Sequence, residues 1–186
     1  MPQGKLIHFV AQSLDGYIEG PQGEFDWTVM DPELSAYSQE VSDVADAFLH
    51  GRVVWDMMSG YWPRAEEISH HEHDLKFAPI WREKPKYVAS RTLEKADWNT
   101  RVLSGDVAAE IREIKASGTN LVLFGGSSLA AHLTEHRLID EYWISVHPVV
   151  LGGGKPVFQD PQRFGVRLLD ARTFDSQVVL MRYAPA

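Results

Sequence analysis

Short apolar runs alternate with longer stretches in which apolar residues recur every three or four positions. The runs at 5–12, 86–90, 101–103 and 120–124 are typical of buried strands, as is the β-branched and aromatic stretch at 141–151. A short strand at 47–50 overlaps a helical pattern. Because strands alternate with helices over most of the length, we expect an α/β fold with a central mixed, mostly parallel sheet flanked by helices.

Residues that favour helix starts indicate where these helices begin. Asp31 precedes Pro32, a pair that caps a helix and fills its first turn. Asp106 precedes a second pattern of helical spacing, and a further short helix is predicted at 53–58.

The remaining segments complete the expected fold. The stretches 166–174 and 178–183 predict a C-terminal antiparallel hairpin, while 61–84 is polar and is expected to be irregular. No linker-like stretch divides the chain, so we expect a single domain at 1–186.

Composition narrows the class of protein. The chain has 186 residues, 44% of them apolar and 24% charged, which is ordinary for a globular domain. A formal net charge of −8 argues against a nucleic-acid partner. The chain has no cysteine, which excludes disulfides and thiolate metal sites. There is no signal-peptide pattern and no apolar run of about 20 residues, so we expect a cytoplasmic protein without a membrane partner.

The stretch 120–129 carries the strongest chemical signal. An apolar strand ends at Gly125 and Gly126, and a helix follows with Ser127 or Ser128 as its expected cap. The inner face of this helix is expected to carry Leu129, Leu133 and Leu138. Glycines at a helix start leave backbone N–H groups accessible where the helix dipole is positive, so this turn suits a phosphate or diphosphate. Glycine pairs also serve in tight turns without any ligand.

Two further turns lie in corresponding positions after predicted strands. They contain Gly51 and Arg52, and Ser90 and Arg91. Because ligands bind at the carboxyl ends of the strands of an open α/β sheet, the three turns together predict a site for an extended dinucleotide. The two arginines and the serine favour a 2′-phosphate, and therefore NADPH over NADH. No G-x-G-x-x-G follows the first strand, so the Rossmann mode of binding is not expected.

Six short segments, in this order and spacing, resemble the dihydrofolate reductase superfamily. They read SLDGYI (13–18), FDW (25–27), LHGRVVW (49–55), YVAS (87–90), LFGGS (123–127) and PVVLGGGKPVF (148–158). The last segment is similar to the group that contains the reductase domain of bifunctional riboflavin-biosynthesis deaminase-reductases.

The resemblance implies an NADPH-dependent reductase that is often a homodimer. By position, the cofactor-binding residues are Gly51, Arg52, Ser90, Arg91, Gly125, Gly126, Ser127 and Ser128. The residues expected beside the substrate are Ser13, Gly16, Trp27, Gly153 and Lys155. The zinc deaminase domain of the bifunctional enzymes needs cysteines, so this chain is expected to be a stand-alone reductase or to act on another substrate.

A carboxylic acid is the natural proton source for hydride transfer, and two candidates exist. Asp15 follows the first strand in a glycine-flanked loop, and Asp31 lies near the position of the substrate carboxylate in dihydrofolate reductases. Asp15–Gly16 also reads as a turn, and Asp31 also reads as the helix cap described above.

The cluster His70, His71, His73 and Asp74 invites a metal interpretation, but neighbouring imidazoles point apart and no distant ligand is evident. We therefore expect a solvated loop and no metal. The leading hypothesis is an NADPH-dependent reductase of a pteridine- or pyrimidine-like small molecule. The alternative is a nucleotide-binding or sensor protein without turnover on the same scaffold.

Overall fold

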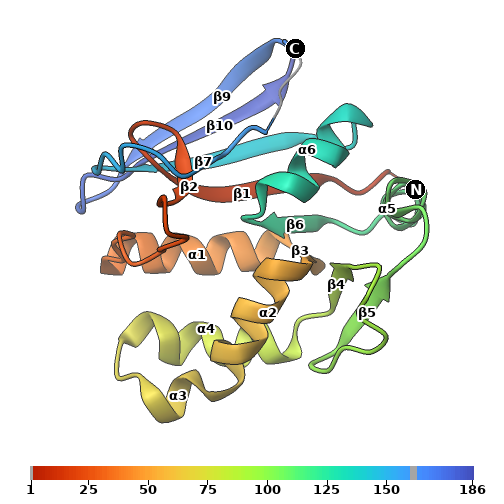
Figure 1. Ribbon diagram of the computed structural model, residues 1–186, viewed down its shortest axis with the longest axis horizontal. Coiled ribbons are helices and arrows are strands. Elements are labelled where there is room, and N and C mark those ends of the chain that lie inside the picture. The colour runs from red at the N-terminus through yellow and green to blue at the C-terminus, as the bar shows by residue number, and fades with distance from the viewer. Residues whose placement is uncertain (1, 160–162) are drawn as a thin grey trace.

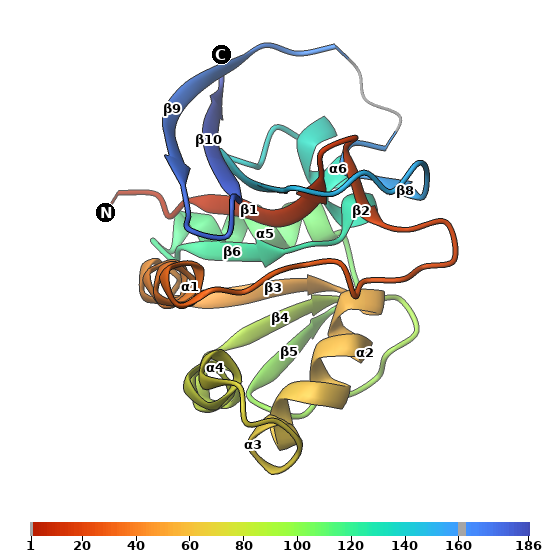
Figure 2. The ribbon, with the colours of Figure 1, turned by 90° about the vertical axis from the view of Figure 1, so that its left-hand side faces the viewer.

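The computed structural model describes residues 2–159 and 163–186, and eight of its strands form one central sheet (Figure 1). The strands are β1 (Leu6–Ser13), β3 (Ala47–Gly51), β4 (Lys86–Ala89), β5 (Thr100–Leu103), β6 (Leu121–Phe124), β7 (Glu141–His147), β9 (Val166–Thr173) and β10 (Val179–Pro185). Their order is β5-β4-β3-β6-β1-β7-β10-β9, and Figure 2 shows this succession from β4 and β5 at the bottom to β9 and β10 at the top.

The sheet is parallel from β5 to β7, and β10 pairs antiparallel with both β7 and β9. The predicted α/β class, the mostly parallel sheet and the C-terminal hairpin are therefore confirmed. A separate two-stranded sheet, formed by β2 (Tyr17–Glu19) and β8 (Lys155–Pro156), was not expected from the sequence.

Helices cover both faces of the sheet. They are α1 (Pro32–Val44), α2 (Arg52–Tyr61), η1 (Trp62–Arg64), α3 (Ala65–Ile68), α4 (Glu72–Glu83), α5 (Val107–Ala116) and α6 (Ser127–Glu135). Buried residues of α1, α2 and α4 pack with Ile7, Phe48 and Val122 of the strands, whereas those of α5 and α6 pack with residues of the opposite face such as Leu49 and Leu121. This division follows from the alternation of side chains along each strand.

The prediction that 61–84 is irregular is wrong. This stretch contains η1, α3 and α4, and α4 buries His73, Phe77, Ala78 and Trp81 on one face. The His73 and Phe77 rings stack with centroids 5.6 Å apart, and Trp81 stacks on Trp55 at 5.7 Å. Aromatic packing offsets the low helix propensity of the histidines and of Pro79. His73 is thus a core residue and does not lie in a solvated loop.

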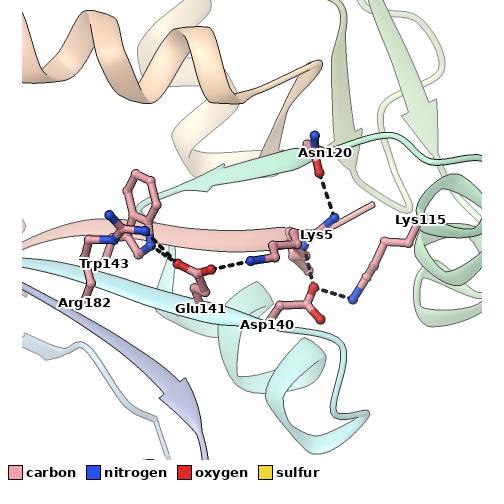
Figure 3. Close-up of polar contacts among 8 residues, drawn as sticks. Lys5, Lys115, Asn120, Asp140, Glu141, Trp143 and Arg182 are labelled. Carbon is pink, nitrogen blue, oxygen red and sulfur yellow. Dashed lines mark hydrogen bonds and ion pairs between the residues drawn. The ribbon is translucent and has the colours of Figure 1, made fainter. Parts of the chain in front are cut away.

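A network of ion pairs closes the amino-terminal ends of β1 and β7 (Figure 3). The buried carboxylate of Glu141 accepts hydrogen bonds from Lys5 Nζ at 2.8 Å, Trp143 Nε1 at 2.7 Å and Arg182 Nη2 at 3.2 Å. Asp140 accepts from Lys115 Nζ and from the backbone N–H of Leu6, both at 2.6 Å. Burial alone would raise the pKa of the Glu141 carboxyl, but these donors outweigh it and hold the pKa below its usual value.

Within the described residues, no helix combines the length and the apolar character that crossing a bilayer requires.

Candidate functional site

The carboxyl ends of β3 and β6 lie side by side, but the chain leaves them in opposite directions. From β3 it passes through α2 to β4, whereas from β6 it passes through α6 to β7 on the far side of β1. The two connections also cover opposite faces of the sheet, because α2 and α6 belong to different core clusters. Such a switch point opens a crevice beyond the strand ends, which is where open α/β sheets bind ligands.

The helices that begin at this edge of the sheet differ in their caps: within the described residues, α1 and α5 have a side-chain cap, whereas α2 and α6 do not. Asp31 caps α1 by accepting the N–H of Leu34 at 2.6 Å, and Asp106 caps α5 by accepting the N–H of Ala109 at 3.0 Å. In contrast, α2 and α6 have Gly51 and Gly126 as N-caps, and neither start receives a hydrogen bond from a side chain of residues 2–159 or 163–186. The two open helix starts are those that flank the switch point.

The starts of α2 and α6 are close together in space. A Cβ atom built at Gly126 would lie 3.5 Å from Val54 Cγ2 in the first turn of α2, and one built at Gly51 would lie 3.7 Å from Leu129 Cβ in the first turn of α6. Two sets of free N–H donors and two positive helix ends therefore meet at one place. This arrangement suits an anion larger than a single phosphate.

The serines of α6 do not cap the helix as predicted. Gly126 is the N-cap and Ser127 is the first helical residue, so both serines lie inside the first turn. Ser128 donates from its hydroxyl to Gln159 Oε1 at 3.0 Å. The hydroxyl of Ser127 is buried and, within the described residues, has no hydrogen-bond partner. A buried hydroxyl without a partner at an open helix start is available to a bound anion. Leu138 lies beyond the end of α6.

The other predicted cofactor residues lie at the ends of β3 and β4. Arg52 donates from Nε to both carboxylate oxygens of Asp56, at 2.9 and 2.8 Å, and from Nη1 to Thr92 Oγ1 at 3.3 Å. Ser90 is buried, and its Oγ accepts the N–H groups of Thr92 and Leu93. Arg91 is exposed. Arg52 thus connects α2 with the loop that carries Ser90 and Arg91.

The predicted substrate residues gather at the ends of β1 and β7, two strands further along the sheet. Ser13 at the end of β1 accepts the N–H of Tyr17, and Gly16 turns the chain with a φ of +90°. Lys155 of β8 pairs with Glu19 of β2 at 3.8 Å. Gly153 lies next to them, since a Cβ there would come within 3.6 Å of Pro21.

Both predicted acids are engaged with neighbouring groups. Asp15 accepts from Ser13 Oγ at 2.7 Å and from the N–H groups of Leu151 and Gly152. Asp31 caps α1 and also accepts the N–H of Ser176 at 2.6 Å. The Ser13 hydroxyl, followed by the backbone donors, lowers the pKa of Asp15, and the N–H of Leu34, followed by Ser176, lowers that of Asp31. Both side chains stay ionised, so these contacts weigh against a role as general acid; that role remains a prediction.

A histidine at the end of β7 lies opposite Ser13 and was not singled out from the sequence. His147 is buried and packs edge-on against the ring of Trp27 at 5.6 Å. Its Nδ1 accepts the N–H of Val29 at 3.3 Å, so the ring proton lies on Nε2. Burial lowers the pKa of His147 to about 4, and the ring is neutral at physiological pH. Its Nε2–H is a donor suited to a substrate carbonyl or ring nitrogen.

Two more buried histidines lie near the switch point. His50 at the end of β3 contacts Phe124 and Trp55, and His8 of β1 lies beneath the Gly125 carbonyl. Burial lowers the pKa of His50 to about 3 and that of His8 to about 4. The signal that identifies them is a single histidine inside an otherwise apolar strand pattern.

Within the described residues, the site contains no metal centre, and a cavity lies away from it. No group of His, Asp and Glu suited to a metal ion occurs among residues 2–159 and 163–186. A cavity of about 940 Å³ lies at the other end of α6 between Thr134, Tyr142 and Phe164.

Comparisons with known proteins identify the family of the chain. A family model described as "RibD C-terminal domain" matches residues 4–180. The uncharacterized protein YyaP of Bacillus subtilis is 35% identical over 98% of this chain and 96% of its own length.

Two solved structures have the same fold. A putative riboflavin biosynthesis protein from Shewanella sp. PV-4 matches with a TM-score of 0.77 and 23% identity, covering 98% of this chain and 99% of that protein. Dihydrofolate reductase from Enterococcus faecalis, complexed with NADP(H) and RAB-propyl, matches with a TM-score of 0.68 and 14% identity, covering 99% and 98%. The fold is therefore that of the dihydrofolate reductases, and by its sequence the chain belongs to the RibD C-terminal domain family.

Proposed function

We propose that this protein is an NADPH-dependent reductase that transfers a hydride to a small pteridine- or pyrimidine-like ring. The observation that carries the proposal is the pair of open helix starts, α2 and α6, at the switch point of the sheet. Their free N–H groups match the diphosphate of a dinucleotide. The NADP(H) bound to the similarly folded dihydrofolate reductase supports the choice of cofactor.

The residues present fit this cofactor. The buried Ser127 hydroxyl has no partner among the described residues, and Gly125 and Gly126 expose the backbone between β6 and α6. Arg91 and the Nη groups of Arg52 lie on the next two turns of the same edge, where they would hold the 2′-phosphate with charge-assisted hydrogen bonds.

The bound nicotinamide supplies the hydride, and the chain positions the acceptor ring and excludes water. Half-buried aromatic rings support a flat acceptor: Phe9 and Phe124 meet edge-on at 5.8 Å directly before the glycine turn. On the β1–β7 side, the Nε2–H of His147 would orient the acceptor through a hydrogen bond, while Trp27 covers that histidine. We further propose that Ser13, Gly16, Gly153 and Lys155 border the substrate.

The direct test follows the oxidation of NADPH by its near-ultraviolet absorbance in the presence of pterins and of amino-pyrimidine ribosyl phosphates. Oxidation that depends on one of these acceptors supports the proposal. Calorimetric titration that detects neither NADPH nor NADH would overturn it.

The second test addresses the phosphate site. Replacing Arg52 or Arg91 by Ala is expected to weaken NADPH about tenfold while leaving NADH nearly unchanged, because the lost contacts are charge-assisted. Arg112→Ala, at an exposed position in the middle of α5, is the matched control. Equal losses for both cofactors would show that the 2′-phosphate lies elsewhere.

One observation favours the alternative function, a nucleotide-binding or sensor protein without turnover. Both Asp15 and Asp31 are committed to backbone donors and held ionised. Tight NADPH binding with no oxidation across the acceptor panel would favour this alternative.

We also propose a cytoplasmic homodimer. β9 is the last strand of the sheet order, and its apolar residues Val166, Leu168 and Leu169 are exposed. A long apolar edge strand is a template for pairing with a second copy. Light scattering of the wild type and of Leu168→Lys tests this: a dimer that becomes monomeric in the variant is expected.

A further inference from the structure

His8 is a polar side chain at the centre of an apolar layer. It lies on β1 between Leu6 and Val10, which are both buried, and its own ring is 1% exposed and packs edge-on against Tyr142 at 6.2 Å. Its Nδ1 has no hydrogen-bond partner in the described part of the chain. Burying an unpaired ring nitrogen costs free energy that an apolar residue at this position would avoid.

Among residues 2–159 and 163–186, one hydrogen bond of this ring is present, and it reaches the glycine turn. His8 Nε2 lies 3.1 Å from the carbonyl oxygen of Gly125. A carbonyl only accepts, so Nε2 carries the proton and donates to it. The N–H of Gly125 donates in turn to the carbonyl of Phe9 at 2.9 Å. Both backbone groups of Gly125 are therefore bonded to consecutive residues of β1.

This bond sets the direction of the next N–H group. The peptide bonds of the described residues are trans, and in a trans peptide the C=O of one residue and the N–H of the next point in opposite directions. Because the Gly125 carbonyl points at His8, the N–H of Gly126 points away from the interior. It joins the free N–H groups of the first turn of α6.

A glycine pair needs such an anchor. Gly125 and Gly126 have φ values of +55° and +66°, and glycine adopts positive and negative φ about equally readily. A reversal of the Gly125–Gly126 peptide would direct the carbonyl oxygen at the bound anion and turn the N–H inward. The lack of side chains that opens the turn to a ligand thus also allows its N–H groups to turn away from the ligand.

We propose that His8 is a positioning residue that holds the Gly125–Gly126 peptide with its N–H toward the ligand and thereby sets the affinity for the diphosphate of the nucleotide. This inference rests on the proposed function. It adds a residue that contacts the cofactor only through the glycine turn.

The experiment measures dissociation constants of NADPH and of adenosine 2′-monophosphate, which has no diphosphate, for three substitutions of His8. His8→Gln places an amide N–H near the position of Nε2 and is expected to retain NADPH affinity. His8→Asn is polar but too short to reach the carbonyl, and His8→Leu has no donor. Both are expected to weaken NADPH about tenfold and to leave adenosine 2′-monophosphate unchanged.

Val10→Ala is the control, because Val10 is buried on the same face of β1 and its aliphatic side chain has no hydrogen-bonding group. Equal NADPH affinity in His8→Asn and wild type would overturn the inference while leaving the proposed function intact. The same holds if Val10→Ala, at a matched loss of melting temperature, weakens NADPH as much as His8→Asn. A wild type that binds no NADPH would instead refute the proposed function. If His8→Leu does not fold, the Gln and Asn pair still decides.

Discussion

The two ends of the parallel strands differ in how their polar groups are satisfied. At the amino-terminal end, Glu141 and Asp140 bind the donors of Lys5, Lys115, Trp143, Arg182 and Leu6. At the carboxyl end, two helix starts and the Ser127 hydroxyl have no side-chain partner in the part of the chain that the structure describes. Polar groups that are satisfied within the chain stabilise the fold, whereas those that are left open at the strand ends are available to a ligand.

The largest expected difference between the two ends is in how the unfolding free energy depends on pH. His8, His50 and His147 are buried and neutral, with pKa values of about 4, 3 and 4 against 6.5 when unfolded. The unfolded chain then binds more protons below pH 6.5, so stability is complete above that pH and falls as the pH drops toward 4. Each histidine contributes up to about 1.4 kcal/mol per pH unit.

The amino-terminal network loses its contribution to stability at a lower pH than the histidines do. The pKa of Glu141 is lower in the folded state than its ordinary 4.5, so its contribution is complete above that pH and is lost only below it. Urea unfolding between pH 7.5 and 4.5 should therefore show a decline that becomes shallower in His50→Leu. An unchanged slope in that variant would contradict the assignment.

Removing the acceptor of the amino-terminal network is the next largest change. Glu141→Ala leaves the N–H of Trp143 buried without a partner and should cost about 3 kcal/mol of unfolding free energy. NADPH affinity should not change, because the carboxyl end is untouched. Glu113→Ala, an exposed position on α5, is the control. A loss of affinity in Glu141→Ala would mean that the two ends are coupled.

Gly126→Ala tests the open end. The φ of +66° strains any side chain, which should cost about 1–2 kcal/mol of stability. A methyl group on the turn should also weaken NADPH at least about tenfold. Gly118→Ala, also at positive φ but in the loop after α5, matches the strain and should leave NADPH affinity unchanged.

The smallest effect compares a closed helix start with the open ones. Asp106→Ala removes the cap of α5 and should cost about 1 kcal/mol in thermal or urea unfolding. NADPH binding should be unaffected. Weaker NADPH in this variant would show that the site extends to α5.

Local patterns were sufficient for much of this molecule. The caps Asp31 and Asp106, the strand at 120–124 with its glycines, and the hairpin all follow from short-range preferences. The helix α4 was missed because histidines and Pro79 obscured the spacing of His73, Phe77 and Trp81. That helix depends on packing against residues such as Trp55 of α2, and the spacing of residues within α4 does not reveal this contact.

The site residues divide in the same way. Gly51, Arg52, Gly125 and Gly126 lie where the order of strands and turns predicted them. The engagement of Asp15 with Gly152 joins positions 137 residues apart, so no nearby pattern reveals it. The hydrogen bond from His8 to Gly125 spans 117 residues and follows from the β1–β6 register alone.

The helices that begin at the switch point belong to the two separate hydrophobic cores, one on each side of the sheet. A nucleotide held by the starts of both helices would link the two hydrophobic cores, although they lie on opposite faces of the sheet. Binding would then stabilise both cores against unfolding, by about 2.7 kcal/mol when the nucleotide concentration is a hundred times its dissociation constant. Amide exchange should slow together in Trp55 and Leu133, although neither side chain would touch the bound molecule.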